Sequence, residues 1–96
     1  MTAPLPDLIL YSRPGCGLCD ETRSLLDALL RQRAAQGRLS PRLLERDIDA
    51  DPELHRAFFL VIPVVELRGR RLELATSAAA IRRLLADVLD AERMDA

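Results

Sequence analysis

The stretch LILYSRPGCGLC, residues 8–19, decides the fold, because it joins two kinds of apolar pattern and holds both cysteines of the 96-residue chain. Its first four residues form an apolar run bounded by turn residues, which is typical of a short buried strand. From Cys16 onward the apolar residues recur at helical spacing, which predicts an amphipathic helix that ends near Gly37. We therefore expect Cys16 at or near the N-cap of this helix and Cys19 inside its first turn. The residues predicted to face the core along the helix are Leu18, Thr22, Leu25, Leu26, Leu29 and Leu30.

The rest of the chain continues with strand and helix patterns. The predicted elements are a strand over residues 43–49, a short helix capped by Asp51, a strand over residues 62–67, a turn at 68–70, a strand over residues 72–74 and a last helix capped by Ser77. This β-α-β-α-β-β-α order makes the first two strands parallel and the last two a hairpin. With helices on both faces, the sequence predicts a single α/β domain over residues 1–96, a three-layer sandwich around a four-stranded mixed sheet.

Composition and charge argue against several classes of protein. Apolar residues make up 49% of the chain, which argues against disorder. The net charge of −1 offers no basic field for nucleic acid or for an anionic membrane. The N-terminal residues lack the features of a signal peptide, and no apolar run approaches the roughly 18 residues that span a membrane. We expect a monomeric cytoplasmic protein whose thiols are kept reduced, which argues against a permanent structural disulfide.

The two cysteines lie in a position that favours a reactive dithiol. Free N–H groups and the positive end of the helix dipole face Cys16, and Arg13 adds positive charge, so the Cys16 thiolate is favoured over the thiol. Asp20 and Glu21 act in the opposite direction, because they place negative charge on the same turn. Cys16 is therefore predicted to attack a disulfide, and Cys19, deeper in the helix, to resolve the mixed disulfide.

Other interpretations of these residues stay open. A structural metal site normally takes four ligands, and this chain supplies Cys16, Cys19 and His55, so a zinc or iron–sulfur site would need two copies of the chain. A redox switch without turnover would use the same dithiol to control a binding surface. Pro63 also has two interpretations, because it either begins a strand or forms a cis peptide bond.

A family resemblance adds to these predictions. The pattern ILYSRPGCGLC at residues 9–19, followed by a helix and by IPVV before a hairpin, resembles glutaredoxins and the wider thioredoxin fold. The chain is more similar still to short bacterial glutaredoxin-like proteins, several of which carry C-x-L-C-D and D-I-D segments, here Cys16–Asp20 and Asp47–Asp49. The resemblance covers about residues 7–90 and implies a thioredoxin-like sandwich with a redox-active CxxC pair.

The resemblance also implies roles for individual residues. The two cysteines match the nucleophilic and the resolving cysteine of the family. Tyr11 matches an aromatic residue five positions before the nucleophile, and Arg13 matches a basic residue three positions before it. Pro63 matches the cis proline of the family, and Ile62 would then offer its backbone to a substrate peptide or to glutathione.

The chain departs from the family in two places. Gly17 and Leu18 replace the Pro-Tyr of glutaredoxins and the Gly-Pro of thioredoxins, so the redox potential does not transfer from either group. Where glutathione-binding glutaredoxins have a Gly-Gly-x-Asp segment, this chain has Leu74–Ser77. Here Thr76, Ser77 and the helix N-terminus either accept a carboxylate or simply cap the helix.

Together these observations predict a thiol–disulfide oxidoreductase that reduces protein or glutathione mixed disulfides. No dissociable cofactor is required, because glutathione or an unidentified reductase would return electrons to the dithiol. The alternative is a non-enzymatic redox switch or a dithiol protein that binds a metal or an iron–sulfur cluster. The predicted substrate-binding residues are Tyr11, Arg13, Ile62, Pro63, Thr76 and Ser77.

Overall fold

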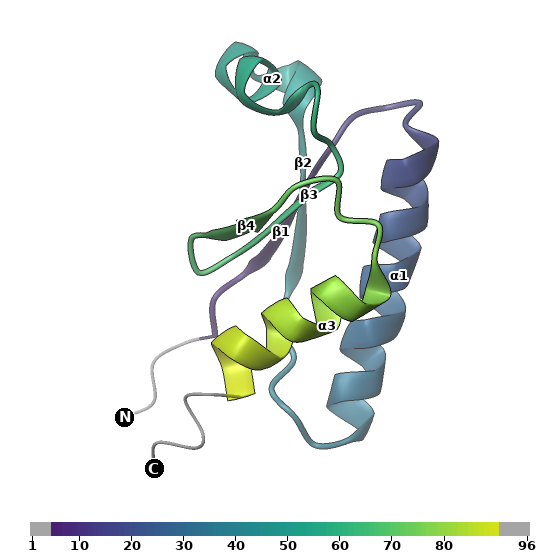
Figure 1. Ribbon diagram of the computed structural model, residues 1–96, viewed down its shortest axis with the longest axis vertical. Coiled ribbons are helices and arrows are strands. Elements are labelled where there is room, and N and C mark those ends of the chain that lie inside the picture. Colours follow the sequence, from purple (N-terminus) through teal and green to yellow (C-terminus); the bar gives the residue numbers. More distant parts are fainter. Residues whose placement is uncertain (1–4, 91–96) are drawn as a thin grey trace.

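A mixed sheet of four strands forms the centre of the computed structural model, which describes residues 5–90 (Figure 1). The strands are β1 (Leu8–Ser12), β2 (Leu43–Asp47), β3 (Val64–Leu67) and β4 (Arg70–Leu72). The helices are α1 (Gly17–Ala35), α2 (Pro52–Phe58) and α3 (Ala78–Leu85), with a 3₁₀ turn at Ile48–Ala50 and a π-helical turn at Ala86–Asp90. In the order β2-β1-β3-β4, β1 runs parallel to β2 and antiparallel to β3, and β3 pairs antiparallel with β4. The predicted element order and the mixed sheet are confirmed.

Two apolar cores lie on opposite faces of this sheet. On β1, Leu8 and Leu10 belong to one core and Tyr11 to the other, as the two-residue period of a strand requires. The larger core includes residues of α1 and α3, and the smaller core includes Phe58 of α2. Helices therefore cover both faces, and the predicted thioredoxin-like three-layer sandwich is confirmed. The larger core consists of Leu8, Leu10, Leu26, Leu29, Leu30, Val65, Leu67, Ala75, Ile81, Leu84, Leu85, Val88 and Leu89, and the smaller of Tyr11, Ile48, Phe58 and Val64.

Residues that the sequence marks as helix boundaries set the ends of the helices. α1 is followed by Gly37, whose φ of 72° is accessible to glycine without steric cost. Asp51 caps α2 by accepting the N–H of Glu53 at 2.9 Å. Ser77 caps α3 by accepting the N–H of Ala80 at 3.2 Å. These three predicted boundaries are confirmed.

The strand predicted over residues 43–49 is too long. β2 ends at Asp47, whose carboxylate accepts the N–H of Asp49 at 2.8 Å and turns the chain into the 3₁₀ turn. Ile48 is therefore buried in the smaller core from this turn and does not share a strand face with Leu44. A local hydrogen bond from a side chain to the backbone has ended the strand early.

The hairpin turn lies within the predicted residues 68–70, but the second strand of the hairpin begins two residues earlier than predicted. Arg68 and Gly69, with φ of 49° and 78°, both adopt left-handed conformations and form a two-residue turn. β4 begins directly after this turn, so the strand predicted over residues 72–74 is shifted. Leu74 lies beyond the strand with a φ of 47°. By contrast, β3 begins at Val64, two residues after the predicted start at residue 62.

The ends of the predicted domain are not covered by this description. Residues 1–4 and 91–96 lie outside the described residues. Between them, the structure has no helix that is both long and apolar enough to cross a bilayer.

Candidate redox site

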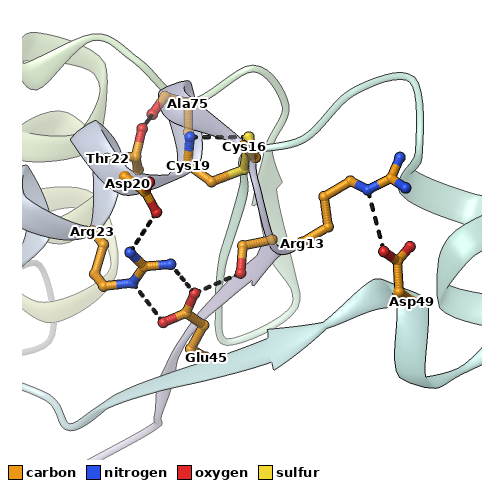
Figure 2. Close-up of a disulfide and its surroundings, with 10 residues drawn as sticks. Arg13, Cys16, Cys19, Asp20, Thr22, Arg23, Glu45, Asp49 and Ala75 are labelled. Carbon is orange, nitrogen blue, oxygen red and sulfur yellow. Dashed lines mark hydrogen bonds and ion pairs between the residues drawn. A yellow bond between two sulfur atoms is a disulfide. The ribbon is translucent and has the colours of Figure 1, made fainter.

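Cys16 and Cys19 lie where β1 gives way to α1, and a disulfide joins them (Figure 2). Cys16 is the N-cap residue of α1, and its Sγ accepts the N–H of Cys19 at 3.1 Å. Cys19 is 0% exposed, whereas Cys16 is partly exposed. In the reduced protein, the same N–H group and the positive end of the helix dipole favour a thiolate at Cys16. The pair thus has one cysteine open to a partner and one that the protein shields.

Pro63 lies before the first residue of β3, next to the end of β1 from which the chain leads to the dithiol. The peptide bond between Ile62 and Pro63 is cis, as the family resemblance implies. Tyr11 near the end of β1 pairs with Val64 at the start of β3, which brings Pro63 beside the segment that leads to Cys16. The N–H of Ile62 donates to the carbonyl of Phe58 at 3.1 Å, so it is not available to a substrate backbone.

Ala75 bridges the proline segment and the dithiol helix. Its N–H donates to the carbonyl of Pro63 at 2.8 Å, and its own carbonyl accepts the hydroxyl of Thr22 at 2.8 Å. Thr22 lies three residues after Cys19 and, like Cys19, is buried on the inner face of α1. Three segments distant in sequence therefore meet at the dithiol: the first turns of α1, the proline segment and the loop before α3.

Arg13 directs its charge away from the cysteines. Its Nε lies 3.3 Å from Oδ2 of Asp49, and Figure 2 shows the guanidinium extended toward Asp49 with the disulfide on the other side. Arg13 was predicted to add positive charge that favours the Cys16 thiolate, but in this conformation its guanidinium pairs with Asp49. The helix N-terminus remains as the positive feature in contact with the Cys16 sulfur.

Tyr11 is part of the smaller core. It is buried, and its ring lies against that of Phe58 with centroids 4.5 Å apart. Its hydroxyl donates to Oε2 of Glu66 at 3.4 Å. Burial, and next the nearby Glu66 charge, raise the pKa of Tyr11 above its ordinary value. The structure gives Tyr11 a packing role between β1 and α2.

Thr76 and Ser77 lie in the loop that leads into α3. The Ser77 hydroxyl serves as the helix cap, which is the simpler of the two roles predicted for it. Thr76 is exposed, and its N–H donates to the carbonyl of Leu74 at 2.8 Å. The loop is thus ordered by its own hydrogen bonds beside the Ala75 bridge.

A polar network beneath the dithiol was not predicted from the sequence. Arg23 contacts Asp20 on its own helix and Glu45 on β2, and Glu45 also accepts the Ser12 hydroxyl at 2.6 Å (Figure 2). Arg23 is not among the residues of this helix that were predicted to face the core. The sequence feature that could have indicated this network was Glu45, a charged residue within the predicted second strand.

Leu18 was predicted to face the core, and that prediction is wrong. The Leu18 residue is 50% exposed. Two other leucines are even more exposed, Leu60 at 77% and Leu74 at 56%. Leu18 lies on α1, Leu60 lies in the turn before Pro63, and Leu74 directly precedes Ala75. These are the three segments described above as meeting near the dithiol. The N–H of Leu74 donates to the carbonyl of Val61 at 2.9 Å, which joins two of these segments directly. We refer to Leu18, Leu60 and Leu74 as the apolar rim.

The third metal ligand considered from the sequence has another neighbour. Nε2 of His55 lies 3.9 Å from Oδ1 of Asp49. Over residues 5–90, the structure shows no cluster of three or more His, Cys, Asp and Glu side chains that could hold a metal ion.

Fold and site together define a protein of the thioredoxin fold that carries a CxxC pair at a helix N-terminus. The family model described as "Glutaredoxin-like domain (DUF836)" matches residues 7–94, and the chain belongs to this family. No match was found among curated protein sequences.

Solved structures share the fold. A structural genomics target protein, XcR50 from X. campestris, is 30% identical, with a TM-score of 0.68 over 84% of this chain and 97% of its own. Protein Ne2328 from Nitrosomonas europaea is 22% identical, with a TM-score of 0.66 over 88% of this chain and 95% of its own. The germline-specific thioredoxin Deadhead from Drosophila melanogaster is 22% identical, with a TM-score of 0.61 over 88% of this chain and 82% of its own.

Proposed function

We propose that this protein is a thiol–disulfide oxidoreductase that reduces mixed disulfides through Cys16 and Cys19. The observation that carries the proposal is the asymmetry of the pair, in which a partly exposed N-cap cysteine is bonded to a fully buried cysteine. An exposed thiolate at a helix N-terminus is suited to attack, and a buried thiol next to it is suited to the second step.

The proposed cycle transfers two electrons from the dithiol to the substrate. The Cys16 thiolate attacks one sulfur of the substrate disulfide, forms a mixed disulfide and releases the other sulfur as a thiolate, which takes a proton from water. Cys19 then loses its proton and attacks the Cys16 sulfur, which releases the second substrate thiol and leaves the disulfide seen in the structure. Glutathione or a reductase returns the two electrons, so the cycle needs no dissociable cofactor and suits a monomer in the reducing cytoplasm.

The surroundings of the dithiol support a protein disulfide as the substrate in preference to glutathione. Glutathione carries two carboxylates, and the nearby cations Arg13 and Arg23 already pair with carboxylates of the protein. The apolar rim offers three leucine side chains that a protein segment would cover and that a small anionic tripeptide would not. Single exposed leucines are ordinary, so the support comes from their placement on the connected segments that carry the dithiol, Pro63 and Ala75.

Single-cysteine variants test the proposal. We expect the wild-type protein to reduce insulin, a model protein disulfide, and Cys16→Ser to abolish that reduction. Cys19→Ser should stop turnover but accumulate a mixed disulfide between Cys16 and the substrate, which mass spectrometry detects. Full activity in Cys16→Ser would contradict the assigned roles. A wild-type protein that forms no mixed disulfide with protein or glutathione substrates would favour a non-enzymatic redox switch.

A further inference from the structure

Glu45 joins both ends of the segment that carries Cys16. It accepts the hydroxyl of Ser12, the last residue of β1, at 2.6 Å. It also accepts Nε of Arg23 at 2.6 Å and pairs closely with the Nη2 group of the same side chain. Because Ser12 and Arg23 flank the cysteine segment, one carboxylate of β2 fixes the strand end relative to the second turn of α1 (Figure 2).

Arg23 also carries this network to the first turn of α1. Its Nη1 donates to Oδ1 of Asp20 at 2.8 Å, and the backbone N–H of Asp20 donates to the carbonyl of Cys16 at 3.1 Å. Asp20 would otherwise place an uncompensated negative charge one turn from the Cys16 sulfur. A single guanidinium therefore holds two carboxylates close to the reacting cysteine.

The charge balance around Cys16 depends on this guanidinium. With Arg23 present, Asp20 and Glu45 leave the network with one net negative charge, and without it they leave two. Outside this network, Arg13 pairs with Asp49, which also lies 3.9 Å from Nε2 of His55, and Glu21 lies exposed on α1 next to Asp20. The Arg13 charge is balanced by Asp49 and does not replace Arg23.

We propose that Arg23 is a positioning residue for Cys16, which offsets Asp20 and Glu45 and so keeps the Cys16 thiolate available for attack. The proposal rests on the proposed function in one respect, because it takes Cys16 to be the reacting thiol. Arg23 acts through its charge and through its contacts with Glu45 and Asp20, which fix the start of α1 against β2. It does not touch the substrate.

The direction of the effect separates charge from simple structural support. Arg23→Gln adds net negative charge and should raise the pKa of Cys16 by about 0.5, the order expected for one partly solvent-screened charge several ångströms away. The thiolate fraction below that pKa, and with it the alkylation rate, should fall roughly threefold. Glu45→Gln and Asp20→Asn each remove a negative charge and should lower the pKa. If the network only supports the fold, Arg23→Gln and Glu45→Gln should instead shift the pKa in the same direction.

The experiment measures the iodoacetamide reaction rate against pH in the Cys19→Ser background, where Cys16 is the single thiol. The matched control is Arg31→Gln, which breaks the 2.8 Å pair with Asp27 further along the same helix and should leave the Cys16 pKa unchanged. Arg23→Lys should restore most of the wild-type value, and Arg23→Gln combined with Asp20→Asn should return toward it.

Shifts of the same sign in Arg23→Gln and Glu45→Gln would overturn the proposal, as would an equal shift in Arg31→Gln. If Arg23→Gln fails to fold, Asp20→Asn still tests the charge balance, because Asp20 lies exposed on the helix surface, and a Cys16 pKa that is unchanged or raised in this variant would overturn the proposal. The thiol reaction requires no turnover, so failure of the disulfide reductase assay and failure of this proposal are separate outcomes.

Discussion

Leu74 holds a backbone conformation that leucine rarely adopts, and its side chain gains little from doing so. Its φ of 47° lies in the left-handed region, which costs a residue with a Cβ atom roughly 1–2 kcal/mol. More than half of the side chain is exposed, so burial offsets only part of that cost. Packing alone therefore does not account for a strained and exposed apolar residue beside the Pro63 segment.

We expect Leu74→Gly to separate stability from activity. Glycine adopts this φ freely, so the free energy of unfolding should rise by about 0.5 kcal/mol once its greater freedom in the unfolded chain is counted. The same change removes one leucine of the apolar rim, so kcat/KM for insulin reduction should fall several-fold. Urea unfolding and steady-state kinetics provide the two measurements. Reduction of a glutathione mixed disulfide serves as the control and should change little, and an equal loss on both substrates would contradict the role of the rim.

For individual residues, the sequence correctly predicted the position of those whose roles depend on neighbouring residues in the chain. Cys16 at the helix N-terminus follows from the spacing of apolar residues around it, and Ser77 as a cap follows from its residue type. The directions of Arg13 and Tyr11 could not be predicted, because Asp49 and Phe58 determine them from distant elements. Leu18 was misplaced for a similar reason, since helical spacing does not show where the helix leaves the sheet.

The two ends of α1 are fixed by side chains that reach other elements. At the C-terminal end, Arg33 is 7% exposed, and its Nε donates to the carbonyl of Leu39 at 2.7 Å. Its Nη2 lies 2.6 Å from Oδ1 of Asp90, at the end of the last helical turn. At the other end, Glu45 joins the helix to β1 and β2 through Arg23 and Ser12. Sequence periodicity found the helix but neither connection, because both depend on partners far away in the chain.

Arg33→Ala should destabilise the protein by about 2–3 kcal/mol. The change removes the hydrogen-bond donor of the Leu39 carbonyl and the closest cation of Asp90. The loss is large because the Arg33 side chain is buried and that of Asp90 is mostly buried. Arg31→Ala is the matched control, because Arg31 is exposed and its pair with Asp27 is worth below about 0.5 kcal/mol. Urea unfolding of both variants decides the matter, and equal losses would show that the buried connection contributes nothing.

Glu45 should make stability depend on acid pH. The hydrogen bonds from Arg23 and then Ser12 hold the pKa of Glu45 below its ordinary value of 4.5, although partial burial opposes them. A depressed pKa in the folded state gives stability that is present above about pH 4.5 and lost as the pH falls through the folded pKa. Wild type should therefore exceed Glu45→Gln by up to about 1 kcal/mol at pH 7, and the difference should shrink below pH 4.5. Urea midpoints at a series of pH values measure it, and a constant difference would refute the linkage.

The whole chain holds no lysine, so all 14 of its Lys and Arg positions are arginine. In the oxidised protein the cysteines do not titrate, and Tyr11 is the single tyrosine. Alkaline changes in stability therefore report on one buried side chain between β1 and α2.

We expect the oxidised protein to lose stability above about pH 10 and Tyr11→Phe to lose much less. Burial and Glu66 raise the folded-state pKa of Tyr11 above its ordinary value of 10.0, so the neutral form stabilises the fold below that pH. This contribution is lost as the pH rises through the raised pKa. Urea unfolding between pH 8 and roughly pH 11 compares the two proteins, and parallel losses would assign the effect to other groups.

The overall fold was the part best predicted from sequence, since the order of strands and helices and the two-residue period of β1 define the layers. The errors lay at element ends, where one side chain or a two-residue turn decides. Asp47 shortened β2, and the two-residue turn formed by Arg68 and Gly69 let β4 begin at Arg70, two residues earlier than predicted. Energies of this local kind are small compared with core burial, so they change boundaries without changing the architecture.

The sheet order places β2 and β4 at the two edges, and both carry charged side chains. Glu45, Arg46 and Asp47 line the outer end of β2, and Arg70 and Arg71 occupy most of the three-residue β4. Edge strands with exposed backbone groups are templates for aggregation, and charged or very short strands prevent such pairing. The protein should therefore remain dispersed at high concentration in the oxidised state. Added salt, which weakens the repulsion between the arginines of two β4 edges, is the condition under which copies of the chain would begin to associate through that edge.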